Sequence, residues 1–237
     1  KAEAEKERMR GNLLRAVSHD LRTPLTSIYG ACSAMRDNFD ALPRQTHMKL
    51  LSDVCADAQW LVRMVENLLS VTRVDAATVR LSKNGTVLEE LIDAVLVKFR
   101  KHYPDIDVHV EIPEEFVSIP MDAMLISQVL MNLLENAVFH AKGMENLRLR
   151  VEVKGSWAYF YVEDDGCGIP EEKLSRLFTG MLDSEAPTDQ SRSSMGIGLS
   201  VCSAIIKAHG GEIWANKRAG GGTEVGFRLE MEDENGE

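Results

Sequence analysis

The chain has 237 residues, of which 44% are hydrophobic, and a formal net charge of −10 at pH 7. This length suits one large domain or two small ones, and the acidic balance argues against a nucleic-acid-binding protein. Since no apolar run reaches about 18 residues, no membrane span is expected. The four cysteines are dispersed, which predicts free thiols, and the histidine spacing predicts no structural metal.

Two stripes of apolar residues at helical spacing fill the first part of the chain, residues 1–75. Steps of three and four residues are typical of one face of a helix close to a heptad repeat. A break at residues 37–43 separates the stripes and predicts an antiparallel helical hairpin. Because two helices cannot enclose a core alone, we expect a four-helix bundle in a homodimer. The stripes are Leu14, Val17, Leu21, Leu25, Ile28, Cys32 and Met35, then Leu51, Val54, Ala58, Leu61, Val65, Leu68 and Thr72.

Residues 76–86 are predicted to be a linker, and residues 87–237 a second domain of mixed helices and strands. Turn residues and changes of periodicity set the expected boundaries. Helices are expected at 88–101, from an N-cap at Asp122 to residue 140, after Pro170, and at 198–209. Strands are expected at 107–112, 116–119, Leu147–Val153, Tyr159–Glu163, 212–216 and 223–230. This content, with a mostly antiparallel sheet, predicts an α+β sandwich.

A histidine near the start of the first helix, His19, lies off the apolar stripe and should face solvent. A neutral imidazole nitrogen is a competent nucleophile near pH 7. The next residue, Asp20, would fix the ring's tautomer by accepting a hydrogen bond from the other nitrogen. Pro24 removes the N–H that would bond the Asp20 carbonyl, which loosens the helix there. On its own an exposed histidine is ordinarily only a surface residue.

Three further motifs follow about 110 to 180 residues later: Asn132-Leu-Leu-Glu-Asn136, Asp165-Gly-Cys-Gly168 and Gly196-Ile-Gly-Leu199. The two asparagines share a helix face, and an amide oxygen coordinates Mg²⁺ without adding negative charge. The third motif precedes a helix, whose first N–H groups can hold phosphate oxygens. Each motif is weak evidence alone, because surface asparagine pairs and ordinary glycine-containing turns without a binding function have the same sequence pattern.

In this order, the motifs resemble the sensor histidine kinases of two-component signalling, over roughly residues 8 to 230. The resemblance implies a dimeric helical hairpin followed by an ATP-binding α+β sandwich of the GHKL ATPase type. It implies transfer of the γ-phosphoryl of ATP to His19, and then to an aspartate on the receiver domain of a response regulator. Catalytic roles implied by the resemblance fall on His19, Asp20, Thr23 (in dephosphorylating the partner) and Glu135, and an ordinary helical threonine is the alternative for Thr23.

The resemblance also implies a set of residues that bind ATP and Mg²⁺. Asn136 would hold Mg²⁺, Asn132 and His140 would line the phosphate side, and Asp165 would accept a hydrogen bond from the adenine amino group. A lid at 179–195 would be anchored by Phe178, for which core packing is the alternative. The remaining implied nucleotide-binding residues are Gly166, Gly168, Arg192, Gly196, Gly198 and Leu199.

One position departs from the family pattern, because Phe139 stands where a phosphate-binding lysine is common. We therefore expect weak ATP binding unless Lys142 or Arg192 substitutes for that cation. The alternatives are a kinase-impaired, phosphatase-biased receptor or a dimeric scaffold. A GHKL ATPase such as a topoisomerase subunit would leave the histidine hairpin unexplained.

Two stretches, residues 18–33 and His209-Gly-Gly-Glu-Ile-Trp-Ala, resemble the potassium-responsive Kdp sensor kinases. The resemblance implies the cytoplasmic portion of a membrane-anchored bacterial receptor. Contact with a membrane is expected only through a region upstream of this chain, since the charged residues 1–10 look like the interior of a helix.

Overall fold

The computed structural model describes residues 21–75, 81–174, 177–178 and 195–231. The chain divides into two compact units, residues 1–69 and 70–237. None of the described helices combines the length and apolarity that a membrane crossing requires.

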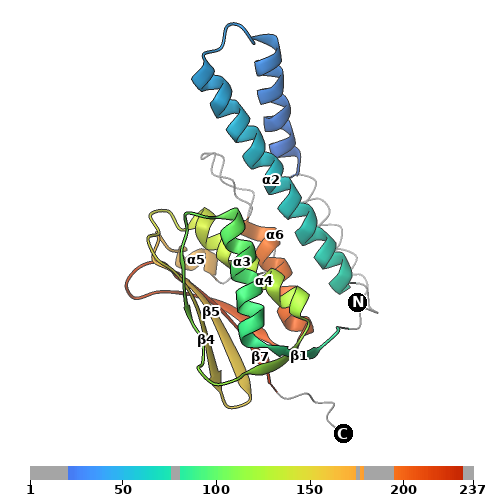
Figure 1. Ribbon diagram of the computed structural model, residues 1–237, viewed down its shortest axis with the longest axis vertical. Helices are drawn as coiled ribbons and strands as arrows, with labels where there is room; N and C mark the ends of the chain where they lie inside the picture. Colours follow the sequence, from blue (N-terminus) through green and yellow to red (C-terminus); the bar gives the residue numbers. More distant parts are fainter. Residues whose placement is uncertain (1–20, 76–80, 175–176, 179–194, 232–237) are drawn as a thin grey trace. The chain divides into compact units, whose positions relative to one another are not determined.

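The first unit is a helical hairpin, as the two apolar stripes predict. Residues 21–37 form one helix, and α2 (Arg44–Asp75) forms the other (Figure 1). The Asn38 carbonyl accepts hydrogen bonds from the N–H groups of Ala41 and Leu42 in the connecting turn, both at 3.0 Å. Several large apolar side chains stay exposed, so the hairpin leaves apolar surface uncovered. They are Leu25, Tyr29, Met48, Leu51, Val62 and Val65.

The second unit contains two sheets. Strands β1 (Asn84–Val87) and β3 (Ser118–Met121) form a short antiparallel pair. The larger sheet has the order β2-β4-β5-β7-β6, with only β2 and β4 parallel. Its strands are β2 (Val108–Glu111), β4 (Leu147–Lys154), β5 (Trp157–Asp164), β6 (Glu212–Lys217) and β7 (Thr223–Glu230).

Helices α3 (Leu88–His102), α4 (Ala123–His140) and α6 (Met195–Ala208) lie on one face of this sheet (Figure 1). A one-turn helix, α5 (Glu171–Leu174), follows Pro170 as expected. The core lies between helices and sheet, where Phe99, Phe160 and Phe227 are fully buried. The other face of the sheet, here called the open face, carries the alternate residues of the strands, among them charged side chains and the aromatic rings of Tyr159, Tyr161 and Trp214. The expected α+β sandwich is confirmed.

The N-cap predicted at Asp122 is confirmed, since its side chain accepts a hydrogen bond from the N–H of Leu125. One expectation is corrected: residues 84–86 are strand rather than linker. Backbone pairing with β3 overrides the weak strand preference of asparagine and glycine there. Likewise β3 begins two residues later than the predicted 116, and α6 begins at Met195, three residues before the predicted start.

A buried histidine joins the end of α6 to the start of α4. His209 is 4% exposed, and its Nδ1 lies 2.8 Å from the Ile205 carbonyl oxygen. Because a carbonyl only accepts, Nδ1 carries the proton, and Nε2 accepts from the backbone N–H of Asp122 at 3.1 Å. The Lys83 ammonium donates to the His209 carbonyl at 3.2 Å. Burial lowers the pKa of His209, so the neutral ring is the form that holds the two helices.

We expect the free energy of unfolding to decrease as pH falls below 6.5, the ordinary pKa of histidine. The unfolded chain takes up a proton there, while folded His209, with its lowered pKa, does not. His209→Gln should cost about 1–3 kcal/mol at neutral pH and flatten this dependence. The flattening is partial, because burial also lowers the pKa of His140. Urea unfolding at several pH values measures both effects, and an unchanged slope in the variant would contradict the assignment.

Candidate functional site

A cavity of about 110 Å³ lies in the second unit, beneath the C-terminal half of α4. Helix α4, the end of β5, the loop after it, the first turns of α6 and the start of β7 all contribute to its wall. The lining is mostly apolar, with a few polar groups, as is typical of a small-molecule site. The lining residues are Leu133, Asn136, Ala137, His140, Ala141, Val162, Asp164, Gly168, Ile169, Pro170, Leu199, Thr223 and Val225.

The carboxylate in this cavity belongs to Asp164, the last residue of β5. Side chains alternate along a strand, and Ala158, Phe160 and Val162 all point to the helix side. Asp164 continues that series and is 7% exposed. Burial raises its pKa, although Oδ1 accepts a hydrogen bond from the Gly166 N–H at 3.0 Å.

The neighbouring Asp165, the residue predicted to bind adenine, does not line the cavity. Its Oδ1 accepts hydrogen bonds from the N–H groups of Glu145 and Asn146 at 2.8 and 2.9 Å. Its Oδ2 accepts from the Asn146 side-chain amide at 2.6 Å. These bonds stabilise the charged form and lower the pKa of Asp165 to about 2. Asp165 therefore closes the loop before β4, and the structure brings Asp164 to the cavity in its place.

Glycines let three backbone segments meet beside Asp164. A Cβ at Gly222 would lie 2.0 Å from the Asp164 carbonyl oxygen, and one at Gly166 would lie 2.6 Å from the Cβ of Ala141. Gly168 has a φ of +71°, and a Cβ there would lie 3.1 Å from the Gly222 carbonyl oxygen. The two predicted loop glycines are therefore required by packing, together with Gly222, which sequence reasoning missed.

Helix α4 presents Asn136 and His140, two of the predicted site residues, to the cavity. The Nδ2 atom of Asn136 is buried without a hydrogen-bond partner in the described structure. His140 is half-buried, which lowers the pKa of its ring, so it is neutral at pH 7. Asn132 is 8% exposed and does not line the cavity, and its Nδ2 is likewise unpaired in the described part of the chain.

Of four other predicted site residues, one lines the cavity. Leu199 is buried and lines it, while Gly196 and Gly198 lie in the first turn of α6. Phe178 is partly buried against the core, which is the packing role left open as its alternative.

Helix α4 also carries Glu135 and Phe139, which both contact Tyr103 at the end of α3. Glu135 accepts a hydrogen bond from the Tyr103 hydroxyl at 3.2 Å and does not line the cavity. Phe139 is 46% exposed, and its ring centroid lies 6.0 Å from that of Tyr103 in an edge-on arrangement. An aromatic contact thus occupies the position at which the family commonly has a lysine.

Several predicted residues cannot be placed relative to this cavity. His19, Asp20, Arg192 and the lid residues 179–194 lie outside the described residues. Thr23 is exposed on the helix 21–37 of the first unit.

Sequence reasoning missed Asp164 and Thr223, although the chain holds a signal for the first. In the pattern Asp164-x-Gly166-x-Gly168, the aspartate lies two residues before the first glycine. It also alternates in step with the strand residues whose side chains face the helices. For Thr223 the signal was weaker: it follows three consecutive glycines, which marked only a turn.

Two cysteines of this unit have opposite surroundings. Cys167 is exposed in the loop between Gly166 and Gly168, with its Sγ 3.4 Å from the His140 carbonyl oxygen. Cys202 is fully buried in α6, and burial raises the pKa of its thiol to about 12.

Comparison with known proteins identifies a family for each of the two parts of the chain. Residues 9–77 match the His Kinase A (phospho-acceptor) domain, and residues 121–233 match the histidine kinase-, DNA gyrase B- and HSP90-like ATPase family. The chain belongs to the sensor histidine kinase family. The predicted combination of a phosphoacceptor hairpin with a GHKL-type domain is thereby confirmed.

Relatives of this histidine kinase include Kdp sensor proteins, as the sequence predicted. It is 35% identical over 233 residues to the sensor protein KdpD of Clostridium acetobutylicum and 32% identical over 223 residues to that of Escherichia coli. These matches cover 98% and 92% of this chain but only 26% and 24% of the relatives. The chain therefore spans about a quarter of their length.

A solved structure shares the fold. The histidine kinase ThkA, in complex with the response regulator protein TrrA, matches with a TM-score of 0.74 and 24% identity. The match covers 98% of this chain and 65% of that one. Since residues 121–233 match the GHKL-type ATPase family, the second unit is expected to bind ATP.

We expect Asp164→Asn to weaken ATP binding roughly tenfold. The amide group would place an N–H donor in the cavity, where the carboxylate can only accept hydrogen bonds. Asp165→Asn is the matched control, since its Oδ1 still accepts from the two N–H groups outside the cavity. Calorimetric titration with ATP compares the two variants. If Asp165→Asn weakened ATP binding as much as Asp164→Asn or more, the result would favour the sequence-based assignment of adenine binding to Asp165.

Proposed function

We propose that this chain is the catalytic portion of a sensor histidine kinase, which transfers the γ-phosphoryl group of ATP to His19. The proposal rests mainly on the cavity that both Asp164 and Asn136 line, in a chain whose first part matches the phosphoacceptor family. A ring nitrogen of His19 attacks the γ-phosphorus, the bond to the β-phosphate oxygen breaks, and ADP leaves with the electron pair. Asp20 holds the proton on the other ring nitrogen.

Recognition of the adenine base is assigned to Asp164 rather than Asp165. The Asp164 carboxylate lies inside the cavity, where it can accept a hydrogen bond from the exocyclic amino group of adenine. The walls formed by Val162, Ile169 and Leu199 suit the faces of a flat apolar base. Gly168 lets the backbone approach that base closely.

The triphosphate is assigned to the side of the cavity nearer the end of α4 and the start of α6. The unpaired amide of Asn136 fits a metal or phosphate ligand, because a buried amide without a partner is costly unless a ligand satisfies it. When bound there, Mg²⁺ supplies charge neutralisation for the phosphate oxygens. Gly196 and Gly198 give N–H groups at the first turn of α6.

Phe139 makes the site poorer in positive charge than the common family pattern. Neutral His140 lies beside it, so the described end of α4 offers no cation to the phosphates. This is the observation that favours the second candidate, a receptor that mainly dephosphorylates its partner through Thr23. The histidine and its following aspartate are retained, which favours the kinase.

Two partners are proposed for the hairpin. A second copy of the chain would cover the exposed apolar residues, including Leu25 and Val62, in a four-helix bundle. A response regulator would accept the phosphoryl group on an aspartate of its receiver domain, as the ThkA–TrrA complex suggests by its components. Because the relatives are sensor proteins about four times longer, the chain is proposed to act at the cytoplasmic side of a membrane-anchored receptor.

Incubation with Mg²⁺ and γ-labelled ATP should give protein-bound label that is labile in acid and stable in alkali. His19→Gln should abolish it, whereas His102→Gln, an exposed histidine of α3, should leave it intact. Label that survives in His19→Gln would point to another acceptor. No label in the parent, with ATP binding preserved, would favour the phosphatase-biased receptor.

Restoring the cation should strengthen ATP binding. We expect Phe139→Lys to lower the Kd for ATP roughly tenfold, with a stronger dependence on salt, since the gain is electrostatic. Phe139→Met, similar in length and uncharged, is the control for losing the contact with Tyr103. Displacement of a fluorescent ATP analogue measures both, and equal affinities of the two variants would refute a charge effect.

A further inference from the structure

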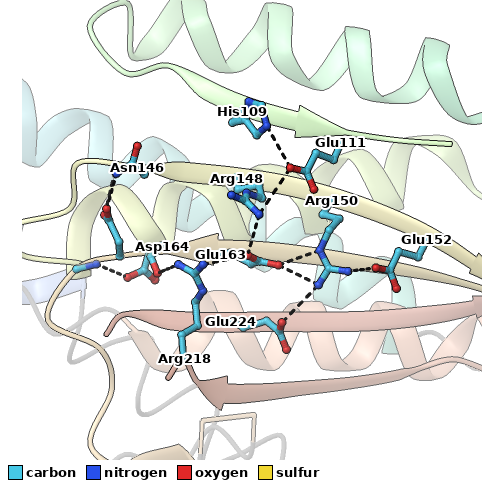
Figure 2. Close-up of polar contacts among 12 residues, drawn as sticks. His109, Glu111, Asn146, Arg148, Arg150, Glu152, Glu163, Asp164, Arg218 and Glu224 are labelled. Carbon is cyan, nitrogen blue, oxygen red and sulfur yellow. Dashed lines mark hydrogen bonds and ion pairs between the residues drawn. The ribbon is translucent and has the colours of Figure 1, made fainter. Parts of the chain in front are cut away.

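A network of charged side chains on the open face of the sheet leads to the cavity carboxylate (Figure 2). Its centre is Glu163, which precedes Asp164 and points to the opposite face of β5. Although it faces outward, Glu163 is only 5% exposed, because arginines cover it. Arg150 donates to Oε1 from Nε and Nη2, at 3.0 and 2.9 Å, and Arg218 approaches Oε2 to 3.3 Å.

Arg218 makes a second contact that reaches the backbone of the nucleotide loop. While its Nη2 pairs with Glu163, its Nη1 donates to the Asp164 carbonyl oxygen at 2.8 Å. One planar guanidinium thus bridges the side chain of one residue and the main chain of the next. A lysine could not reproduce this, since it lacks two donors in a fixed fork.

The turn that carries Arg218, residues 218–222, also packs against the Asp164 carbonyl. The Arg218 N–H donates to the Gly222 carbonyl at 3.2 Å, and the Gly221 N–H donates to the Arg218 carbonyl at 3.2 Å. Gly222 packs so closely on the Asp164 carbonyl oxygen that a Cβ there would lie 2.0 Å away. The peptide after Asp164 is therefore fixed from two directions, by a hydrogen bond and by a close contact.

Fixing that peptide fixes the carboxylate, because the Asp164 side chain leaves the same Cα and has few rotamers. Its Oδ1 is already held by the Gly166 N–H. What Arg218 adds is the position of the strand end relative to the cavity. Removing Arg218 leaves Glu163 paired with Arg150, so the buried acid keeps a partner and the sheet keeps its core.

We propose that Arg218, oriented by Glu163, is a positioning residue that sets the cavity's preference for a 6-amino purine by holding Asp164 in place. The inference rests on the proposed binding of ATP in this cavity. It concerns discrimination at the 6-position of the base, which a loss of general packing would not alter selectively.

The test compares ATP with purine riboside triphosphate, which lacks the 6-amino group, by calorimetric titration of the whole chain. The parent should bind ATP roughly tenfold more tightly than the analogue. Arg218→Met should bind ATP roughly tenfold more weakly and the analogue within about twofold of the parent, so that the preference disappears. Arg218→Lys, a milder change, should lose most of the preference as well.

Arg228→Met is the matched control, since Arg228 also lies on the open face but pairs with Glu212 and stacks on Trp157. It should leave the preference unchanged. Equal weakening of both nucleotides in Arg218→Met would show a purely structural role and overturn the inference, as would an unchanged preference in Arg218→Met and Arg218→Lys. A parent chain that binds the two nucleotides equally would overturn it too. Failure of the parent to bind either nucleotide would instead refute the proposed function, and this inference with it.

Discussion

The alternation of side chains along β5 is the constraint on which the arrangement of the cavity depends. β5 pairs with β4 on one side and β7 on the other, so its register is fixed from both directions. That register sends Phe160, Val162 and Asp164 to the helices, and Tyr161 and Glu163 to the open face. A slip of one residue would bury Glu163 in the cavity and expel Asp164. The strong apolar core under β5 is thus also what directs a carboxylate into the cavity.

Sequence periodicity predicted the regular elements well, because each depends on its own residues. The strand 223–230 and the cap at Asp122 are where the pattern placed them. Strand β1 was missed because its formation depends on a partner more than thirty residues away. That Asp164 rather than Asp165 lines the cavity has a related reason: the phase of the preceding strand decides which of the two adjacent aspartates faces the helices.

The bridge made by Arg218 could not be predicted from the sequence. It joins residues 54 positions apart, and nothing in a single sequence distinguishes Arg218 from other arginines of the sheet. Helical spacing predicted a shared face for Asn132 and Asn136, of which only Asn136 lines the cavity, and His140 was implied by the family resemblance. The site therefore divides into groups placed by local periodicity and groups placed by tertiary packing.

The two units satisfy their outer surfaces differently. On the open face, charged side chains pair with one another, as Arg150 does with Glu163, so this surface is stable in water without a cover. On the hairpin, exposed Leu25 and Val62 have no such compensation, and covering them gains free energy.

The contrast between Cys167 and Cys202 has a practical consequence for following the nucleotide. A thiol with a pKa of about 12 in a closed core is inert to maleimides at neutral pH, whereas Cys167 is open to solvent. With the hairpin's Cys32 and Cys55 replaced by serine, a fluorophore could therefore be attached at a single known point beside the cavity. Its emission would follow arrival and departure of the nucleotide in real time, separately from any phosphoryl transfer at the hairpin.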